Sequence, residues 1–240
     1  MKQILILLTI APQLSNAQDS LTTEKSKVFS FAFYLSPDYS FRTLKNNDGS
    51  SSGDFVIKAR NSIETGKPGF TTGISTKING SKRISGETGL YYSNMGYKIE
   101  ELTLDYQQPD PGSPTKMRST VNFHYISIPV KLNFTAGNGR ARFIAGAGLA
   151  ANFLLKESEK FTLTYADGSE RNKKESSTHD YKKFNISSLT SIGFEYKLKE
   201  KIFLRAEPTL RYGLLKITDT PVTEHLWSIG LNMGVYIQPG

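Results

Sequence analysis

The sequence predicts an all-β fold and, within that class, an eight-stranded antiparallel up-and-down transmembrane β-barrel. Apolar and polar residues alternate in eight separate segments of the chain, as expected of strands with one apolar face. The segments run for 11 to 17 residues, whereas an ordinary strand has about 5 to 6 and a tilted membrane-crossing strand about 9 to 11. Short and long connections alternate between the segments, which is the layout of an outer-membrane barrel.

The first three strands are predicted at residues 28–42, 69–79 and 83–99. In the first, Phe29, Phe31 and Phe33 alternate with small or polar residues. The second and third continue the pattern around Ile74 and Leu90, and the third loses its phase near residues 94–96. Each segment therefore has one apolar and one polar face.

The fourth strand, residues 120–134, carries two apolar phases. Val121, Phe123 and Tyr125 share one face, whereas Ile126 and every second residue after it take the other. A change of phase by one residue predicts a β-bulge near Tyr125–Ile126.

Four further strands complete the predicted barrel. They lie at residues 141–155, 184–196, 202–214 and 225–238. In the last of them Ile229, Leu231 and Met233 alternate with Gly230 and Asn232, again with a period of two.

The connections divide into two kinds. Short links at 80–82, 135–140 and 197–201 alternate with long polar links at 43–68, 100–119 and 156–183, and the link at 215–224 is intermediate. The long links are rich in Asn, Ser, Gly, Pro and Lys, as water-facing loops are. Within the last long link, "KFTLTYADGSE" at 160–170 alternates and predicts a hairpin that extends the barrel beyond the membrane.

The polar faces carry charges, so the side on which they lie decides the architecture. Long strands, a uniform apolar phase and aromatic residues near strand ends, such as Tyr39, Tyr92 and Tyr236, favour apolar faces turned to lipid. The interior of an eight-stranded barrel is filled by side chains, and charges buried there must pair. We therefore expect a structural ion-pair network in the lumen, formed by Glu87, Lys131, Glu195, Arg205, Glu207 and Arg211.

The first residues predict an export signal. Lys2 precedes an apolar run at 4–10, and Ser15-Asn16-Ala17 precedes Gln18, which gives a basic region, an apolar region and a cleavage site. The apolar run is too short to span a bilayer as a helix. We expect a signal peptide over residues 1–17 and an outer-membrane barrel domain over residues 18–240.

Composition narrows the chemistry. The chain has no cysteine, so the sheet must be stable without disulfides. The formal net charge of +8 is scattered through loops and turns, so we expect no nucleic-acid partner. His124, His179 and His225 lack metal-ligand spacing, and the phosphate-loop motif is absent. We expect no cofactor, no metal and no catalytic residue, and we assign no ligand-binding residues.

Several stretches together resemble one family, the PorT-like outer-membrane β-barrel proteins of Bacteroidota. They are "GLYYSNMGYK" (89–98), "HYISIPVKLNF" (124–134), "FIAGAGLAANFLL" (143–155), "GFEYKLKEKIFLRAEPTLRYGLL" (193–215) and "WSIGLNMGVYI" (227–237). The resemblance implies an antiparallel barrel in the outer membrane with both termini in the periplasm, and some members of the family support protein secretion. It offers no catalytic motif to carry over. The sequence departs from many outer-membrane barrels by ending "YIQPG" rather than on an aromatic residue.

The expected function is that of an integral outer-membrane barrel with a structural, interaction or secretion-assisting role and no evident catalysis. Its partners would be outer-membrane lipid and a protein that binds loops 43–68, 100–119 and 156–183. A first alternative is a small transport pore or a lipid-modifying enzyme, for which His124 and Ser127 would need a bulge to share one face. A second alternative is a secreted, soluble ligand-binding barrel with its apolar residues inside.

Overall fold

The computed structural model describes residues 29–108, 112–175 and 181–239, so the predicted signal peptide lies outside the described residues. The elements in these ranges are β1 (Phe29–Asn46), α1 (Ser51–Ile63), β2 (Glu64–Asn79), β3 (Ile84–Thr103), β4 (Pro114–Ala136), β5 (Ala141–Tyr165), β6 (Glu170–Glu175), β7 (Phe184–Lys199), β8 (Ile202–Gly213) and β9 (Val222–Ile237). No helix in the described ranges is long and apolar enough to cross a membrane.

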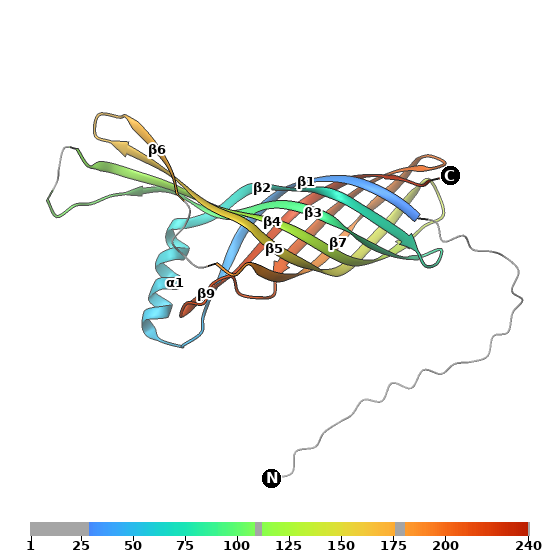
Figure 1. The fold of residues 1–240 in the computed structure, drawn as a ribbon, viewed down its shortest axis with the longest axis horizontal. Helices are drawn as coiled ribbons and strands as arrows, with labels where there is room; N and C mark the ends of the chain where they lie inside the picture. The colour runs from blue at the N-terminus through green and yellow to red at the C-terminus, as the bar shows by residue number, and fades with distance from the viewer. Residues whose placement is uncertain (1–28, 109–111, 176–180, 240) are drawn as a thin grey trace, which may run out of the picture.

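Eight of the strands form a closed antiparallel ring. Neighbours follow the order β4-β3-β2-β1-β9-β8-β7-β5, and pairing of β4 with β5 closes the ring. The remaining strand, β6, pairs only with the far end of β5, from Glu159 to Thr164. The predicted fold class is confirmed, and Figure 1 shows the barrel lying along the long axis of the molecule.

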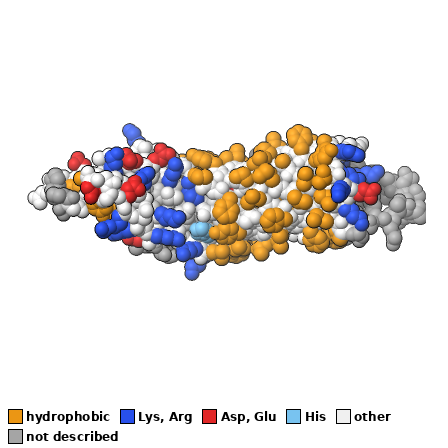
Figure 2. Space-filling view, turned by 90° about the horizontal axis from the view of Figure 1, so that it is seen from above, with side chains coloured by type: hydrophobic (Ala, Val, Ile, Leu, Met, Phe, Trp, Pro, Cys, Tyr) orange, Lys and Arg blue, Asp and Glu red, His pale blue; other side chains and the backbone are white. Residues whose placement is uncertain are grey.

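The apolar face of each ring strand points away from the barrel. On β1, Phe31 and Phe33 are exposed, whereas Ser30, Ser36 and Ser40 are buried inside. The same alternation runs around the ring, and it leaves an apolar band around the middle of the molecule with charged residues beyond both edges (Figure 2). The interior is therefore the polar side of the wall.

The two ends of the barrel differ. The short links 80–83, 137–140 and 200–201 lie at one end, where β1 begins and β9 ends. At the other end β3, β4, β5 and β6 continue past the ring as a projecting sheet, and α1 lies beside them (Figure 1). We call these the short-turn end and the long-loop end.

The long polar link predicted at 43–68 is wrong in its detail. The first strand continues to Asn46, the second begins at Glu64, and α1 fills the interval between them. The Ser50 side chain caps the helix by accepting a hydrogen bond of 3.0 Å from the Gly53 amide, which satisfies one of the free N–H groups of the first turn. Asp54 in the first turn and Arg60 in the last suit the helix dipole.

The other two long links are also shorter than predicted. The third strand reaches Thr103 and the fourth begins at Pro114, while β5 runs on to Tyr165. The hairpin expected at 160–170 forms between β5 and β6, with its turn at 166–169. These continuations build the projecting sheet.

The predicted bulge in the fourth strand is not present. Pairing of β3 with β4 is continuous from Tyr91↔Ser127 to Ile99↔Ser119, so Val121, Phe123 and Tyr125 point inward like the polar residues that follow them. The register shift in this region belongs to β5, where Leu155 has no partner between Leu154 and Lys156. Beyond the apolar band the apolar residues of β4 therefore line the interior instead of the outer surface.

Candidate functional site

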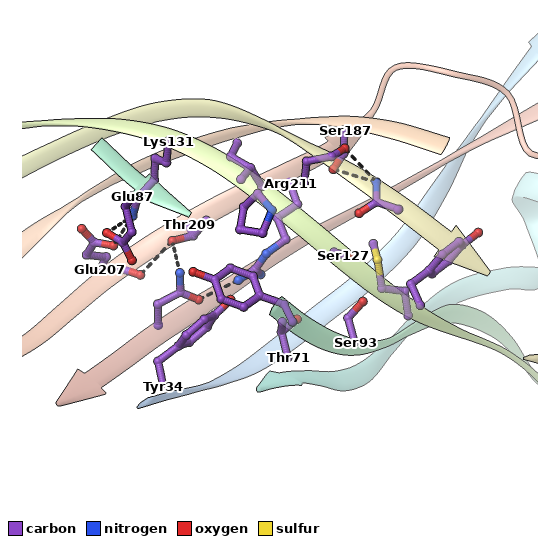
Figure 3. A pocket seen from close by; sticks show the side chains of 18 of the residues that line it. Tyr34, Thr71, Glu87, Ser93, Ser127, Lys131, Ser187, Glu207, Thr209 and Arg211 are labelled. Atoms are coloured by element: carbon purple, nitrogen blue, oxygen red, sulfur yellow. Dashed lines mark hydrogen bonds and ion pairs between the residues drawn. The ribbon is translucent and has the colours of Figure 1, made fainter. Parts of the chain in front are cut away.

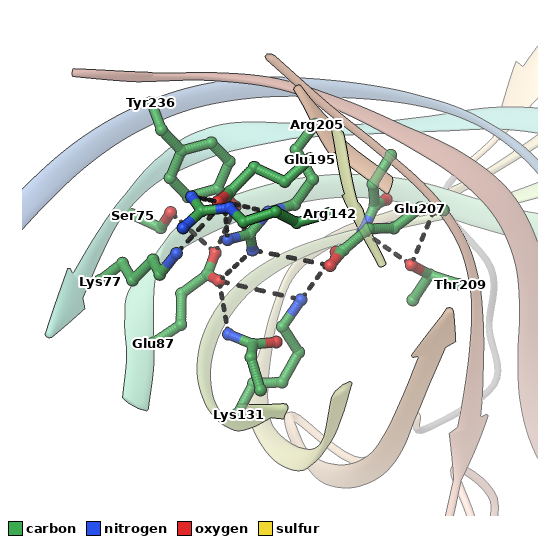
Figure 4. A network of polar contacts seen from close by, with 12 residues as sticks. Ser75, Lys77, Glu87, Lys131, Arg142, Glu195, Arg205, Glu207, Thr209 and Tyr236 are labelled. Carbon is green, nitrogen blue, oxygen red and sulfur yellow. Dashed lines mark hydrogen bonds and ion pairs between the residues drawn. The ribbon is translucent and has the colours of Figure 1, made fainter. Parts of the chain in front are cut away.

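The interior holds a group of charged side chains near the short-turn end, which we call the lower network. Its members are Lys77, Glu87, Lys131, Arg142, Glu195, Arg205 and Glu207, together with Tyr236 (Figure 4). They occupy inward positions on strands around the ring. All of them except Arg142 are buried, so their charges must compensate one another within the barrel.

Arg205 on β8 is the centre of the lower network. Its Nη2 lies 2.7 Å from Glu195 Oε2, and its Nη1 lies 2.9 Å from Glu87 Oε2 and 3.6 Å from Glu207 Oε1. The guanidinium also lies 4.0 Å from the centre of the Tyr236 ring, in cation–π range. One planar, multidentate cation therefore joins three carboxylates.

Other cations complete the lower network. Lys131 Nζ lies 2.8 Å from Glu207 Oε2, and Lys77 Nζ lies 3.2 Å from Glu195 Oε2. The other oxygen of Glu195, Oε1, pairs with Arg142. Four cations thus share three carboxylates. Glu87 also accepts hydrogen bonds from three uncharged side chains, those of Ser75, Asn133 and Tyr236, at 3.0, 3.0 and 2.8 Å.

The structure places all six residues of the predicted lumen set inside the barrel, but in two groups. Five belong to the lower network, whereas Arg211 lies apart and pairs with Asp38, its Nη1 lying 3.1 Å from Asp38 Oδ1. Sequence reasoning missed Asp38, Lys77 and Arg142 as partners. Each of the three stands in the polar phase of its strand, and that phase is the signal that could have found them.

A small cavity of about 60 Å³ is lined by Glu87, Lys131 and Glu207 of the lower network and by Arg211 (Figure 3). Thr71, Ser93, Ser127, Ser187 and Thr209 contribute polar groups to its wall. Arg211 also donates a hydrogen bond of 2.7 Å to Asn232 Oδ1. A space of this size accommodates a few water molecules and is too small for an organic substrate.

An apolar layer closes the interior above this cavity. It consists of Tyr97, Val121, Phe123, Tyr125, Ile217 and Leu226, all buried. Phe123 is fully enclosed and meets Tyr181 edge to face at 4.8 Å between ring centres. Phe123 and Tyr125 belong to the first apolar phase of β4, so the change of phase in the sequence marks this layer.

A second charged group, the upper cluster, lies above the apolar layer and holds α1 to the ring. Its ion pairs join Arg42 to Glu64 at 2.7 Å, Arg60 to Glu64 at 2.6 Å and Arg60 to Glu224 at 2.7 Å. Arg60 also donates a hydrogen bond of 3.2 Å to the Tyr97 hydroxyl. The cluster connects the helix with β1, β2, β3 and β9, and sequence reasoning did not identify it.

The environment fixes the protonation of the upper cluster. Burial opposes the charge of Arg60, but hydrogen bonds to Glu64 and the charge of Glu224 outweigh it and raise the pKa of Arg60 above its usual range. Burial, reinforced by Glu224, raises the pKa of the Tyr97 hydroxyl well above its ordinary value. Arg60 therefore stays charged and Tyr97 stays a neutral donor across the physiological range.

Comparison with known proteins identifies the family. Residues 16–219 match the model of the outer membrane protein beta-barrel domain. The chain belongs to this family. No curated protein matches the chain. Solved structures similar to it include Neisserial surface protein A (16% identity, 87% of this chain and 99% of that chain, TM-score 0.43) and OprG of Pseudomonas aeruginosa (12%, 89% and 97%, TM-score 0.44).

Membership in the outer-membrane barrel family gives the ends and faces of the molecule their environment. The apolar band contacts lipid, and short turns of such barrels face the periplasm while long loops face outward. From this general rule we infer that the short-turn end is periplasmic and the long-loop end extracellular. One predicted lipid-interface aromatic is wrong, because Tyr236 points into the lower network and is 4% exposed.

The histidines of this outer-membrane barrel do not build a site with Ser127. His124 faces outward, where its Nδ1 lies 2.6 Å from the Tyr92 hydroxyl, whereas Ser127 faces the interior. Without the predicted bulge the two side chains stay on opposite sides of the wall. His225 stacks on Tyr212, and His179 lies outside the described residues. No cluster of metal-ligating side chains occurs in the part of the chain that the structure describes.

Proposed function

We propose that this outer-membrane protein is a closed barrel that acts through its extracellular surface, in a structural, interaction or secretion-assisting role. The observation that carries the proposal is the filled interior. The lower network, the apolar layer and the upper cluster follow one another along the lumen, and the cavity between them holds about 60 Å³. An ion would have to displace paired charges and then cross the apolar layer, which is costly.

The lower network serves a structural role in this proposal. Three of its ion pairs, Lys77–Glu195, Lys131–Glu207 and Arg205–Glu87, join strands that are not neighbours in the ring, so they tie different parts of the wall together. Eight-stranded barrels have an interior that side chains can fill, and paired charges suit a wall whose outer face is already apolar. The lumen is then a core rather than a path.

The extracellular end offers the surface for a partner protein. The stretches 43–68, 100–119 and 156–183, expected to bind a partner, contain α1 and most of the projecting sheet. On α1, Phe55 is 73% exposed and its neighbour Val56 is also exposed, although the upper cluster holds the helix in place. An anchored helix with an exposed aromatic side chain suits recognition of a partner protein.

The resemblance to PorT-like barrels of Bacteroidota supports a secretion-assisting role as the finer form of this proposal. The proposal includes export through a signal peptide cleaved after Ala17, which leaves Gln18 as the first residue of the mature protein. N-terminal sequencing of the protein purified from outer membranes tests the cleavage site. An intact residue 1 would contradict it.

The alternatives differ in how well the structure supports them. The cavity is the observation that favours a small transport pore, and it would need the apolar layer to move. The lipid-modifying enzyme loses its candidate residues, because His124 and Ser127 lie on opposite sides of the wall. The soluble barrel required apolar residues inside, whereas they face outward on the strands of the ring.

Conductance in a planar bilayer tests the proposed function. We expect the refolded protein to insert without stepwise ion conductance, while a large open porin in the same setup gives clear steps. Steps that change in size when Arg211 is replaced by Gln would place an open path through the lumen and overturn the proposal. Insertion is checked separately by the altered gel mobility of the unboiled protein.

A further inference from the structure

A group of basic side chains lies on the outer surface just beyond the extracellular edge of the lipid-facing band. The band ends there at a row of aromatic rings, with Phe70 5.8 Å from Tyr92 and Tyr92 6.0 Å from His124 between ring centres. Beyond His124 lie the exposed Lys156, Lys160 and Lys174 and the buried Lys67, and we call these four the lysine cluster. Figure 2 shows Lys and Arg side chains gathered beyond this edge of the apolar band.

Strand register brings the lysine cluster together. His124 on β4 is opposite Lys156 on β5, and Lys160 on β5 is directly opposite Lys174 on β6. From β2, Lys67 reaches Asn94 on β3, its Nζ lying 2.7 Å from Asn94 Oδ1, and Asn94 is opposite His124. Strands β2, β5 and β6 thus contribute cations to one patch.

Acidic residues do not neutralise this patch. Glu159 and Glu175 pair with each other across β5 and β6 one position away, so they point to the opposite face of the sheet. Within the described residues, none of the four lysines forms an ion pair with a carboxylate. Like charges directly opposite one another on neighbouring strands, as at Lys160 and Lys174, are unfavourable on their own.

The electrostatics agree with the geometry. Burial and the charges of all four lysines lower the pKa of His124. Burial first, and then the charge of Lys160, lower the pKa of Lys67 to about 8. The patch is therefore a region of uncompensated positive potential in which an anion would be stabilised.

We propose that the lysine cluster binds the phosphate of a lipid headgroup in the outer leaflet. The position favours a lipid over a dissolved anion, because the cluster begins where the lipid-facing aromatic row ends and so lies at headgroup level. Ammonium groups form strong charge-assisted hydrogen bonds to phosphate oxygens. The acyl chains of the same lipid would lie along the apolar band below.

The test measures binding of a diphosphorylated glycolipid, diphosphoryl lipid A, to the refolded full chain in neutral detergent micelles. We expect it to bind more tightly than the same lipid stripped of its phosphates. The double variant K160Q/K174Q should weaken that binding by about tenfold or more, since it removes two charge-assisted contacts. The matched control K173Q, one position away on the other face of β6, should change it by less than about twofold.

The outcomes distinguish a lipid ligand from a dissolved anion. Equal affinity for the phosphorylated and dephosphorylated lipids would overturn the proposal. The proposal would also be overturned if inorganic phosphate displaced the phosphorylated lipid at a concentration equal to that of the lipid, because the cluster would then be a site for a free anion. Correct folding of each variant is established by its unboiled gel mobility, and a rise in the pKa of His124 on lipid binding, followed by NMR, reports on the site without any substitution.

Discussion

Replacing Arg205 by Met should destabilise the barrel more than breaking an exposed ion pair does. Arg205 is 2% exposed in its side chain and forms ion pairs with Glu195, Glu87 and Glu207 at 2.7, 2.9 and 3.6 Å. In its absence Glu195 and Glu207 keep other cations, but Glu87 retains only Lys131 at 3.9 Å. Leaving one buried carboxylate poorly compensated costs about 3 to 5 kcal/mol of unfolding free energy, or roughly two to nearly four powers of ten in the unfolding equilibrium.

Unfolding by urea in lipid vesicles measures this cost. The single tryptophan, Trp227, packs against Phe41 with 6.2 Å between ring centres and reports on folding by fluorescence. The unboiled gel band gives an independent folded fraction. Arg118→Met is the matched control, because Arg118 and Glu170 form an ion pair whose side chains are each 48% exposed, and such pairs contribute at most about 1 kcal/mol.

A double variant checks the physical cause. R205M/E87Q removes the charge that R205M leaves uncompensated, so it should recover at least about half of the lost stability. A loss below about 1 kcal/mol for R205M, or no recovery in the double variant, would refute the view that the lower network holds the barrel together.

Three further predictions concern other parts of the molecule. Val130 is 64% exposed within the lipid-facing stretch of β4. Changing it to Arg should lower the free energy of unfolding by about 2 to 4 kcal/mol in the same urea titration, and an unchanged midpoint would place this face outside lipid. Arg60→Ala removes the contacts of α1 with Glu224 and should speed tryptic cleavage after Lys58 by about tenfold, while the unboiled gel mobility stays that of the folded barrel. Binding of phosphorylated lipid should weaken as pH rises from about 7 to about 9, because Lys67 loses its proton over this range. Lys67 has a pKa of about 8 and faces Asn94, His124 and Lys160. An affinity of the wild type that does not change with pH, or a K67Q variant with the same pH dependence as the wild type, contradicts this assignment.

The ring could be predicted from sequence because one physical rule operates along every strand. A barrel in lipid needs apolar residues outside and small or polar ones inside, so the period of two persists over each crossing. The same rule placed the six predicted lumen residues inside. It could not pair them, because partners such as Lys77 and Glu195 are 118 residues apart and meet only through the register of the closed ring.

The elements that sequence reasoning missed, the helix α1 and the projecting strands, lie outside the lipid-facing band. There water surrounds both faces of the sheet, and the constraint of alternation is lost. The projecting strands therefore resemble polar loops in the sequence. The helix α1 has exposed Phe55 and Val56 and no apolar stripe, so a period of 3.6 is weak, and only the Ser50 cap and the early Asp54 indicated it.

The β4 strand shows how a correct observation led to a wrong structure. Its apolar phase does change at Tyr125–Ile126, but the backbone does not bulge there. The surroundings change instead, from lipid outside to an apolar layer inside. A phase change along a membrane strand can therefore mark the edge of the bilayer.

The cross-lumen ion pairs also bear on how the protein is assembled. Lys77 on β2 meets Glu195 on β7, Lys131 on β4 meets Glu207 on β8, and Arg211 on β8 meets Asp38 on β1. None of these strand pairs are neighbours in the ring, so these three ion pairs form only when the ring closes. In an open sheet Glu195 would keep only Arg142 and Arg205, on the neighbouring strands β5 and β8. An open sheet with these charged side chains on one face would be costly to place in hydrocarbon, which favours closing the ring, including the seam between β1 and β9, before or during insertion.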